Sequence, residues 1–157
     1  MIRPTIPSDT ATLVTMAGDT GVFKPLEIQA LQEVLDDFHS QANKEGHRSI
    51  TYEQDGHLAG FAYFAPAAMT DRTWYLWWIV VNKQIQARGI GGKLLSRVEE
   101  EIRHSGGRLL LIETSSLPHY DLTRRFYLKH GYKQATVLHD FYADGDDLVV
   151  YSKRITN

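Results

Sequence analysis

A glycine-rich segment between an apolar strand and an amphipathic helix constrains this chain more than any other feature. Residues 73–81 are nearly all apolar, as in a strand that is covered on both faces. Residues 86–92 contain three glycines, and the apolar positions over residues 90–102 recur at helical spacing. Glycine lets a backbone approach a ligand closely, and the first turn of a helix presents amides with no acceptor inside the helix. The segment therefore predicts a site for a phosphorylated cofactor.

Two common nucleotide-binding patterns do not fit this segment. A Walker A loop needs Gly-x-x-x-x-Gly-Lys-Ser/Thr, but Ala87 stands at the first glycine position and Leu94 at the hydroxyl position. A dinucleotide fingerprint needs Gly-x-Gly-x-x-Gly, and although Gly89 and Gly91 match it, Leu94 occupies the third position. A nucleotide hydrolase is therefore disfavoured, and binding of ATP with Mg²⁺ would be needed to revive it.

A different pattern, Gln/Arg-x-x-Gly-x-Gly/Ala, fits fully at Gln86, Gly89 and Gly91. A second block at residues 124–132 has the form Phe-Tyr-x-x-x-Gly-Tyr, and one strand separates the two blocks. With both blocks in this order, the chain resembles the GNAT superfamily of acyl-CoA-dependent N-acetyltransferases. The resemblance covers nearly the whole chain and is weakest over residues 1–40.

Periodicity and turn residues predict the order βααβββαβαββ, which agrees with the GNAT fold. We expect an α/β protein with a central mixed sheet of six to seven strands flanked by about four helices, as a single domain over residues 1–157. Ser8 or Asp9 is expected to cap the first helix, and Gly60 to allow close approach or a bulge within its strand. The predicted strands cover residues 2–4, 49–54, 58–64, 73–81, 109–112, 132–141 and 148–155, and the helices residues 8–17, 25–41, 90–102 and 121–129.

Composition excludes several function classes. The chain has no cysteine, which removes disulfides, a thiolate nucleophile and a cysteine-based zinc site. Its seven histidines include no i, i+4 pair that would hold a metal from one helix, so we expect no metal. A formal net charge of −2 does not favour nucleic acid, and no apolar run approaches a membrane span. We therefore expect a cytoplasmic protein with no nucleic-acid or membrane partner.

The resemblance implies that acetyl-CoA is the cofactor and CoA the product. In the family, the glycine loop holds the pyrophosphate of CoA, and the end of the preceding strand pairs with the pantetheine arm. By resemblance, the amide of Val81 polarises the thioester carbonyl. The cofactor-binding residues expected on this basis are Ile79, Val80, Val81, Gln86, Ala87, Arg88, Gly89, Ile90, Gly91, Gly92, Lys93, Phe126 and Lys129.

Catalytic candidates follow from the second block and from the strand before it. Tyr127 occupies the family's general-acid position, where its phenol would protonate the departing thiolate. The strand glutamate of some relatives is replaced by Tyr75, so Glu113 is the leading candidate for the base, with His119 second. Glu113 as part of a structural ion pair, or at a solvated strand end, is the alternative. Tyr120 stands where many relatives have an asparagine that contacts pantetheine.

The acceptor is expected to be a primary amine that attacks the thioester directly in a ternary complex. Candidate acceptor-binding residues are Phe23, Trp77, Asp140 and Tyr142, and the acidic, aromatic segment 140–147 favours a small cationic amine over a protein amine. Two alternatives remain: a non-catalytic CoA-binding sensor or interaction module, and an acyltransferase that uses a longer acyl-CoA. Exposed strand edges in such folds also allow a homodimer.

Overall fold

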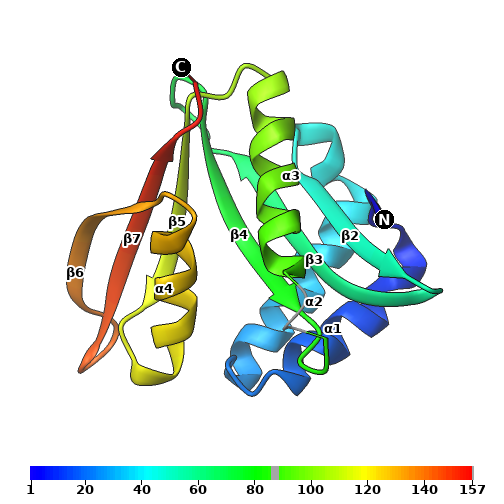
Figure 1. The fold of residues 1–157 in the computed structure, drawn as a ribbon, viewed down its shortest axis with the longest axis horizontal. Coiled ribbons are helices and arrows are strands. Elements are labelled where there is room, and N and C mark those ends of the chain that lie inside the picture. Colours follow the sequence, from blue (N-terminus) through cyan, green and yellow to red (C-terminus); the bar gives the residue numbers. More distant parts are fainter. Residues whose placement is uncertain (86–88, 157) are drawn as a thin grey trace. The chain divides into compact units, whose positions relative to one another are not determined.

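The computed structural model describes residues 1–85 and 89–156 (Figure 1), so the predictions for Gln86, Ala87 and Arg88 lie outside the described residues. The order βααβββαβαββ is confirmed. The elements are β1 (Ile2–Pro4), α1 (Thr10–Asp19), α2 (Pro25–Ser40), β2 (Arg48–Gln54), β3 (His57–Pro66), β4 (Thr73–Val81), α3 (Ile90–His104), β5 (Leu109–Ser115), α4 (Asp121–Lys129), β6 (Lys133–Ala143) and β7 (Asp146–Arg154).

Within the described part of the chain, the strands form one seven-stranded sheet in the order β1-β2-β3-β4-β5-β7-β6. β4 and β5 are parallel, whereas β1–β2, β2–β3, β5–β7 and β6–β7 are antiparallel. The expected mixed sheet of an α/β protein is thus confirmed. The chain divides into two compact units, one of Met1–Pro66 with Trp78–Val98 and one of Ala67–Trp77 with Glu99–Asn157.

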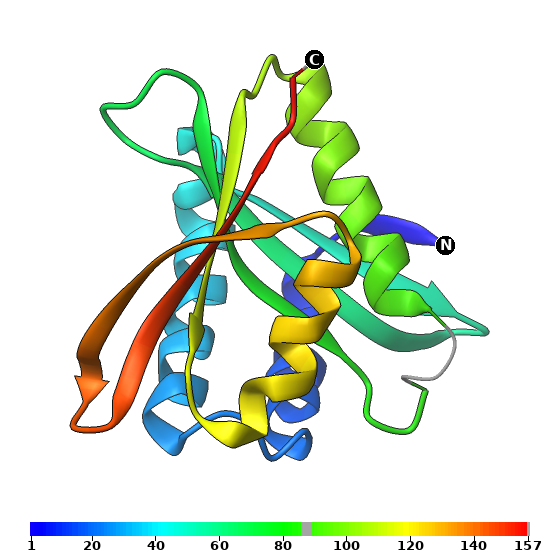
Figure 2. The same ribbon diagram turned by 60° about the vertical axis from the view of Figure 1, so that its left-hand side comes forward.

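Within the first unit, the core lies between the helix pair α1 and α2 and one face of β3, while the first turns of α3 lie on the other face of that strand (Figures 1 and 2). α2 begins at Pro25, and the carboxylate of Glu27 accepts a 3.0 Å hydrogen bond from the Lys24 amide just before it. The helical spacing of apolar residues in α2 then aims them at β3. The buried core residues are Leu13, Met16, Ala17, Leu31, Leu35, Phe38, Phe61, Tyr63 and Val80.

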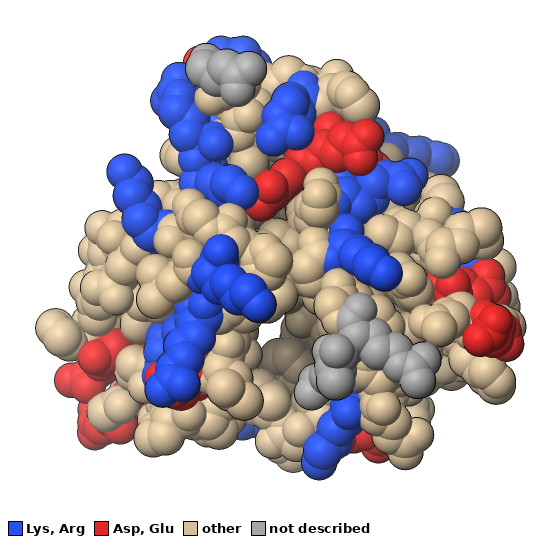
Figure 3. Space-filling view, viewed as in Figure 1, with Lys and Arg blue, Asp and Glu red and all other residues tan. Residues whose placement is uncertain are grey.

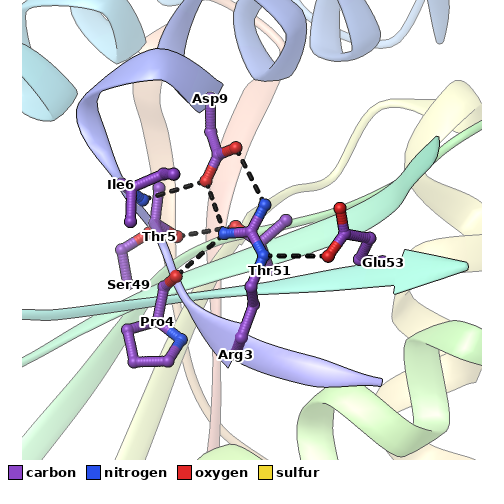
Figure 4. A network of polar contacts seen from close by, with 8 residues as sticks. All are labelled: Arg3, Pro4, Thr5, Ile6, Asp9, Ser49, Thr51 and Glu53. Carbon is purple, nitrogen blue, oxygen red and sulfur yellow. Dashed lines mark hydrogen bonds and ion pairs between the residues drawn. The ribbon is translucent and has the colours of Figure 1, made fainter. Parts of the chain in front are cut away.

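A polar network ties the N-terminal strand to the turn that follows it (Figure 4). Arg3 binds Asp9 with two hydrogen bonds of 2.8 and 3.0 Å and donates a third, of 3.1 Å, to Glu53. Asp9 stands at the N-cap of α1 but makes no side-chain capping bond there. Its carboxylate instead accepts from the Ile6 amide at 2.9 Å, because the 3-10 turn η1 (Pro7–Asp9) precedes the helix. The predicted capping role of Asp9 is therefore wrong.

In the second unit, β5 lies between β4 and β7, and α4 places Tyr127 beside Tyr151 of β7. The Tyr127 ring centroid lies 5.4 Å from that of Phe126 and 5.9 Å from those of Tyr132 and Tyr151. β5 includes the predicted buried stretch 109–112 and extends past Glu113, which was expected at the end of this strand, through Ser115. Its last residues, Thr114 and Ser115, are polar but buried, so hydropathy did not reveal them as strand.

Charge of both signs is present on the surface. The chain has 17 lysine and arginine residues against 19 aspartate and glutamate residues, and side chains of both kinds lie on the face drawn in Figure 3. No described helix combines the length and hydropathy needed to cross a membrane.

Candidate functional site

The segment between β4 and α3 begins with a tight turn. The Ile85 amide donates to the Asn82 carbonyl at 2.9 Å, and the Gln84 amide donates to the Asn82 side chain at 2.9 Å. The Asn82 amide in turn donates to the Ala59 carbonyl of β3 at 2.8 Å. These bonds fix where the chain leaves β4, and so define the start of the glycine segment.

Gly89 has the left-handed backbone conformation that glycine adopts without strain, with φ of 70°. The Lys93 amide donates to the Gly89 carbonyl at 3.1 Å, which is the first hydrogen bond of α3. The amides of Ile90, Gly91 and Gly92 therefore have no acceptor inside the helix. The helix dipole adds partial positive charge at this end, and the arrangement can bind an anion.

Among the residues that the structure describes, and apart from its chain neighbours, none has a heavy atom within 4 Å of a Cβ atom built on Gly89. Gly89 is exposed, whereas Ile90 is buried and anchors the first turn of α3. The Lys93 ammonium lies over the Tyr52 ring, 5.9 Å from its centroid. The predicted cofactor residues of this segment that the structure describes thus lie together at one end of α3.

On β4, the predicted cofactor residues differ in burial. Val80 is buried in the core of the first unit, while Ile79 and Val81 are half-buried. The side chain of Val80 therefore serves packing, and the role expected for these three residues belongs to their backbone groups.

Tyr127 is buried, with 3% of its surface exposed. Burial raises the pKa of its phenol, and the nearby Tyr120 adds to that effect. The phenol is therefore protonated at neutral pH. Of the two other candidates on α4, the Phe126 ring lies next to Tyr127, whereas Lys129 is exposed in the last turn.

The connection from β5 to α4 is braced by residues that the sequence did not single out. Ser115 and Asp146 form a buried hydrogen bond of 2.5 Å, and the Leu117 amide donates to the Ser115 hydroxyl oxygen at 3.1 Å. The hydroxyl therefore donates its own hydrogen to the carboxylate. Arg124 of α4 donates to the carbonyls of Ser115 and Leu117 at 2.6 and 3.1 Å. No local pattern in the sequence signals this brace, because its members come from three elements.

The two candidate bases are both accessible. Glu113 is exposed on β5, where it lies opposite Val150 of β7. His119 is exposed in the 3-10 turn η4 (Pro118–Tyr120), with its ring 4.9 Å from that of Tyr120. An exposed carboxylate on a strand is able to accept a proton from an incoming amine.

The β6–β7 hairpin holds two of the predicted acceptor residues. Asp140 has φ of 57°; its amide donates to Asp147 at 2.9 Å, and its Oδ1 accepts from the Gly145 amide at 2.8 Å. This carboxylate thus stabilises the turn itself. The Tyr142 and Phe141 rings are edge to face at 4.9 Å and both are exposed. The hairpin combines carboxylates with aromatic faces, which attract cations.

Phe23, another predicted acceptor residue, lies in the loop between α1 and α2. Its ring centroid is 5.0 Å from that of Trp78, and both pack against the core of the first unit. Trp77, which the sequence had suggested, is an exposed residue of β4. Among the described residues, no group of three or more histidine, aspartate or glutamate side chains is arranged to hold a metal ion.

Known proteins resemble this chain in sequence and in fold. An uncharacterized N-acetyltransferase of Methanocaldococcus jannaschii is 30% identical over 82 residues, so that the match spans half of this chain and half of that protein. A structure assigned to the GNAT acetyltransferase family from Desulfovibrio desulfuricans is 34% identical, covers 99% of each chain and superposes with a TM-score of 0.95. An aminoglycoside 6′-N-acetyltransferase in complex with coenzyme A shares the fold at 20% identity and a TM-score of 0.81, over 100% of this chain and 98% of that one.

The family assignment rests on the matched segment of the chain and on the solved structure that is 34% identical. A family model described as Acetyltransferase (GNAT) matches residues 20–132, more than half of the chain, and this range includes the glycine segment and Tyr127. The chain therefore belongs to the GNAT acetyltransferase family.

Proposed function

We propose that this chain is an N-acetyltransferase that transfers the acetyl group of acetyl-CoA to a primary amine of a small molecule, and that residues 1–157 act as one catalytic domain. The observation that carries the proposal is the start of α3. Gly89 has φ of 70°, a Cβ atom there would meet no heavy atom of the described residues beyond its chain neighbours, and the three amides that follow have no acceptor in the helix, in a chain of the GNAT family.

Those features fit the pyrophosphate of CoA, because open backbone and a helix N-terminus favour a diphosphate. Gly89 and the first turn of α3 would hold it, with Gln86, Ala87 and Arg88 contributing from the same loop. Lys93 would add positive charge, and Phe126 and Lys129 would contact CoA from α4. When bound, acetyl-CoA supplies a thioester whose carbonyl carbon an amine can attack.

The residues of the chain would then manage charge and protons. The Val81 amide would donate a hydrogen bond to the carbonyl oxygen as it gains negative charge, an effect of a few kcal/mol for one such donor. Glu113 would accept the proton that the amine nitrogen loses as its bond to carbon forms. Tyr127 would give its phenolic proton to the sulfur as the carbon–sulfur bond breaks, since a phenol carries its proton at neutral pH.

A cationic amine suits the residues proposed for the acceptor. Asp140 would attract its positive charge, and Phe23, Trp77 and Tyr142 would offer aromatic surface. The aminoglycoside enzyme that shares the fold has a name that describes an acceptor of this chemical type. That likeness supports a small amine as the first class to test.

A thermal-shift titration tests the cofactor assignment, using acetyl-CoA, free CoA, NAD and ATP with Mg²⁺ as separate ligands. Ligand binding to the native state raises the melting temperature, so we expect a shift with the two CoA species alone. No shift with either of them would overturn the proposal. A panel of amines, assayed by release of free thiol, then tests turnover. If the protein binds CoA but turns over no amine, the result would favour a non-catalytic CoA-binding sensor. If it turns over an amine only with a longer acyl-CoA, the result would favour an acyltransferase that uses longer acyl groups.

A further inference from the structure

Gly60, in the middle of β3, is buried against both elements that frame the proposed CoA site. A Cβ atom built on it would lie 2.8 Å from the Val80 carbonyl oxygen, 3.0 Å from Cδ1 of Leu94 and 3.4 Å from Cγ2 of Ile90. Val80 belongs to the end of β4, and Ile90 and Leu94 belong to the first turns of α3. All four residues are part of the same compact unit.

Position 60 requires glycine because there is too little space for a side chain, and not because of the backbone conformation. The left-handed glycines of this chain include Gly89 but not Gly60, so an alanine at position 60 would not be strained by a left-handed backbone. A strand glycine costs stability relative to alanine because it gains more conformational freedom in the unfolded chain. The stability that alanine would add at this position is therefore opposed by the close contacts that its Cβ would make.

The contact with Val80 is the least able to yield. A carbonyl oxygen is part of a planar peptide, so moving it away from a new Cβ tilts the whole Val80–Val81 peptide unit. That unit carries the Val81 amide, which the proposed function uses to polarise the thioester carbonyl. Gly60 is thus in contact with the far side of the peptide group that is proposed to act in catalysis.

The first turn of α3 packs against the same part of β3. Gly60 pairs with Tyr52 across the β2–β3 ladder, and the Lys93 ammonium lies over the Tyr52 ring. Ile90 and Leu94, which are fully buried, flank the position where a Cβ would stand. A side chain at position 60 would push this turn outward and with it the amides proposed to hold the pyrophosphate.

We propose that Gly60 is a positioning residue. Because it has no side chain, it sets both the tilt of the Val80–Val81 peptide and the position of the first turn of α3. The proposal rests on the proposed function and adds a residue that does not itself touch CoA. It predicts that a single methyl group at position 60 weakens cofactor binding and slows turnover in a protein that is still folded.

The test compares Gly60→Ala with Gly18→Ala. Gly18 is an exposed residue of α1 without a left-handed backbone, and a Cβ there would meet no heavy atom of the described residues outside its own helix backbone and chain neighbours within 4 Å, so it is a matched control. We expect Gly60→Ala to bind acetyl-CoA about tenfold more weakly and to have a lower kcat, with Gly18→Ala unchanged. Calorimetry gives the dissociation constants, and circular dichroism spectra recorded below the melting transition show whether each variant is folded. A variant that has only lost stability would have a lower melting temperature but an unchanged dissociation constant.

A second pair of variants keeps the proposal testable if Gly60→Ala does not fold. Leu94→Val removes the Cδ1 atom that lies closest among the side chains, so the double variant Gly60→Ala/Leu94→Val is compared with Leu94→Val alone. Weaker acetyl-CoA binding by the double variant supports the proposal, because the Val80 carbonyl still opposes the new Cβ. Equal affinity within either folded pair overturns it. Failure of the wild-type protein to bind acetyl-CoA would instead overturn the proposed function.

Discussion

The hydroxyl of Tyr132 donates a 2.7 Å hydrogen bond to Oε2 of Glu99, and the Lys153 ammonium lies 3.1 Å from the other oxygen of that carboxylate. Lys153 also donates to the His130 carbonyl at 3.0 Å. Burial raises the pKa of the Tyr132 phenol, and the charge of Glu99 raises it further, so the phenol remains a donor over the physiological range. One carboxylate on α3 thereby links the end of α4, the start of β6 and β7.

Tyr132→Phe should lower the free energy of unfolding by about 2 kcal/mol, since it removes one hydrogen bond to a charged, nearly buried acceptor. Urea unfolding measures the effect, and Tyr142→Phe on the exposed hairpin is the control for the same chemical change. Equal unfolding midpoints for Tyr132→Phe and the wild type would contradict the linking role of this bond.

Asp9→Asn should lower stability at neutral pH but have little effect in strong acid. Burial, the largest single influence, acts to raise the pKa of Asp9, but the hydrogen bonds from Arg3 and Ile6 and the charge of Arg3 together hold it below 3.8. A depressed carboxyl pKa contributes stability that is present above the unfolded value and lost as the pH falls through the folded value. The two proteins should therefore differ by about 2 kcal/mol at pH 7 and converge in acid.

Unfolding curves at a series of pH values measure that convergence. Asp71→Asn is the control, because Asp71 also has a lowered pKa beside Arg72, but its side chain is 73% exposed and solvent screens the pair. A constant difference between Asp9→Asn and the wild type from neutral to acid pH would contradict this prediction.

Gly89→Asp should abolish measurable binding of acetyl-CoA, whereas Gly89→Asn should weaken it much less. Both residues tolerate the left-handed conformation of position 89 better than other side chains do, and they have nearly the same shape. The pair therefore isolates the effect of a negative charge placed at the proposed pyrophosphate site. Calorimetric titration gives both affinities, and equal affinities would remove the phosphate site from this loop.

Tyr127→Phe should reduce kcat about 100-fold with little change in the affinity for CoA, because general acid catalysis contributes to the chemical step and not to cofactor binding. Tyr151→Phe makes the same change in a buried ring 5.9 Å away and should keep nearly full activity. Steady-state kinetics with an accepted amine measure both. Full activity of Tyr127→Phe would end its assignment as the acid.

The fold was predictable because its signals are local. The apolar run of β4, the turn at Asp55 and Gly56 and the helical spacing in α2 each depend on a few neighbouring residues, and the structure confirms the elements that they predicted. The ends of elements were less predictable. β5 extends through Ser115 because partners on β7 bury polar residues that look like loop in the sequence.

The candidate site, like the fold, has features that follow from local sequence and features that depend on contacts between distant residues. The sequence by itself determined the family motif, the glycine at position 89 and the tyrosine at position 127, since glycine conformation and motif spacing are properties of a short segment. Only the tertiary structure decided that Asp146 is 4% exposed and bonded to Ser115, that Arg124 holds the β5–α4 connection, and that Gly60 lies against the Val80 carbonyl. These contacts join residues that are distant in the chain, and which polar group or which space a residue meets depends on how the packed elements come together.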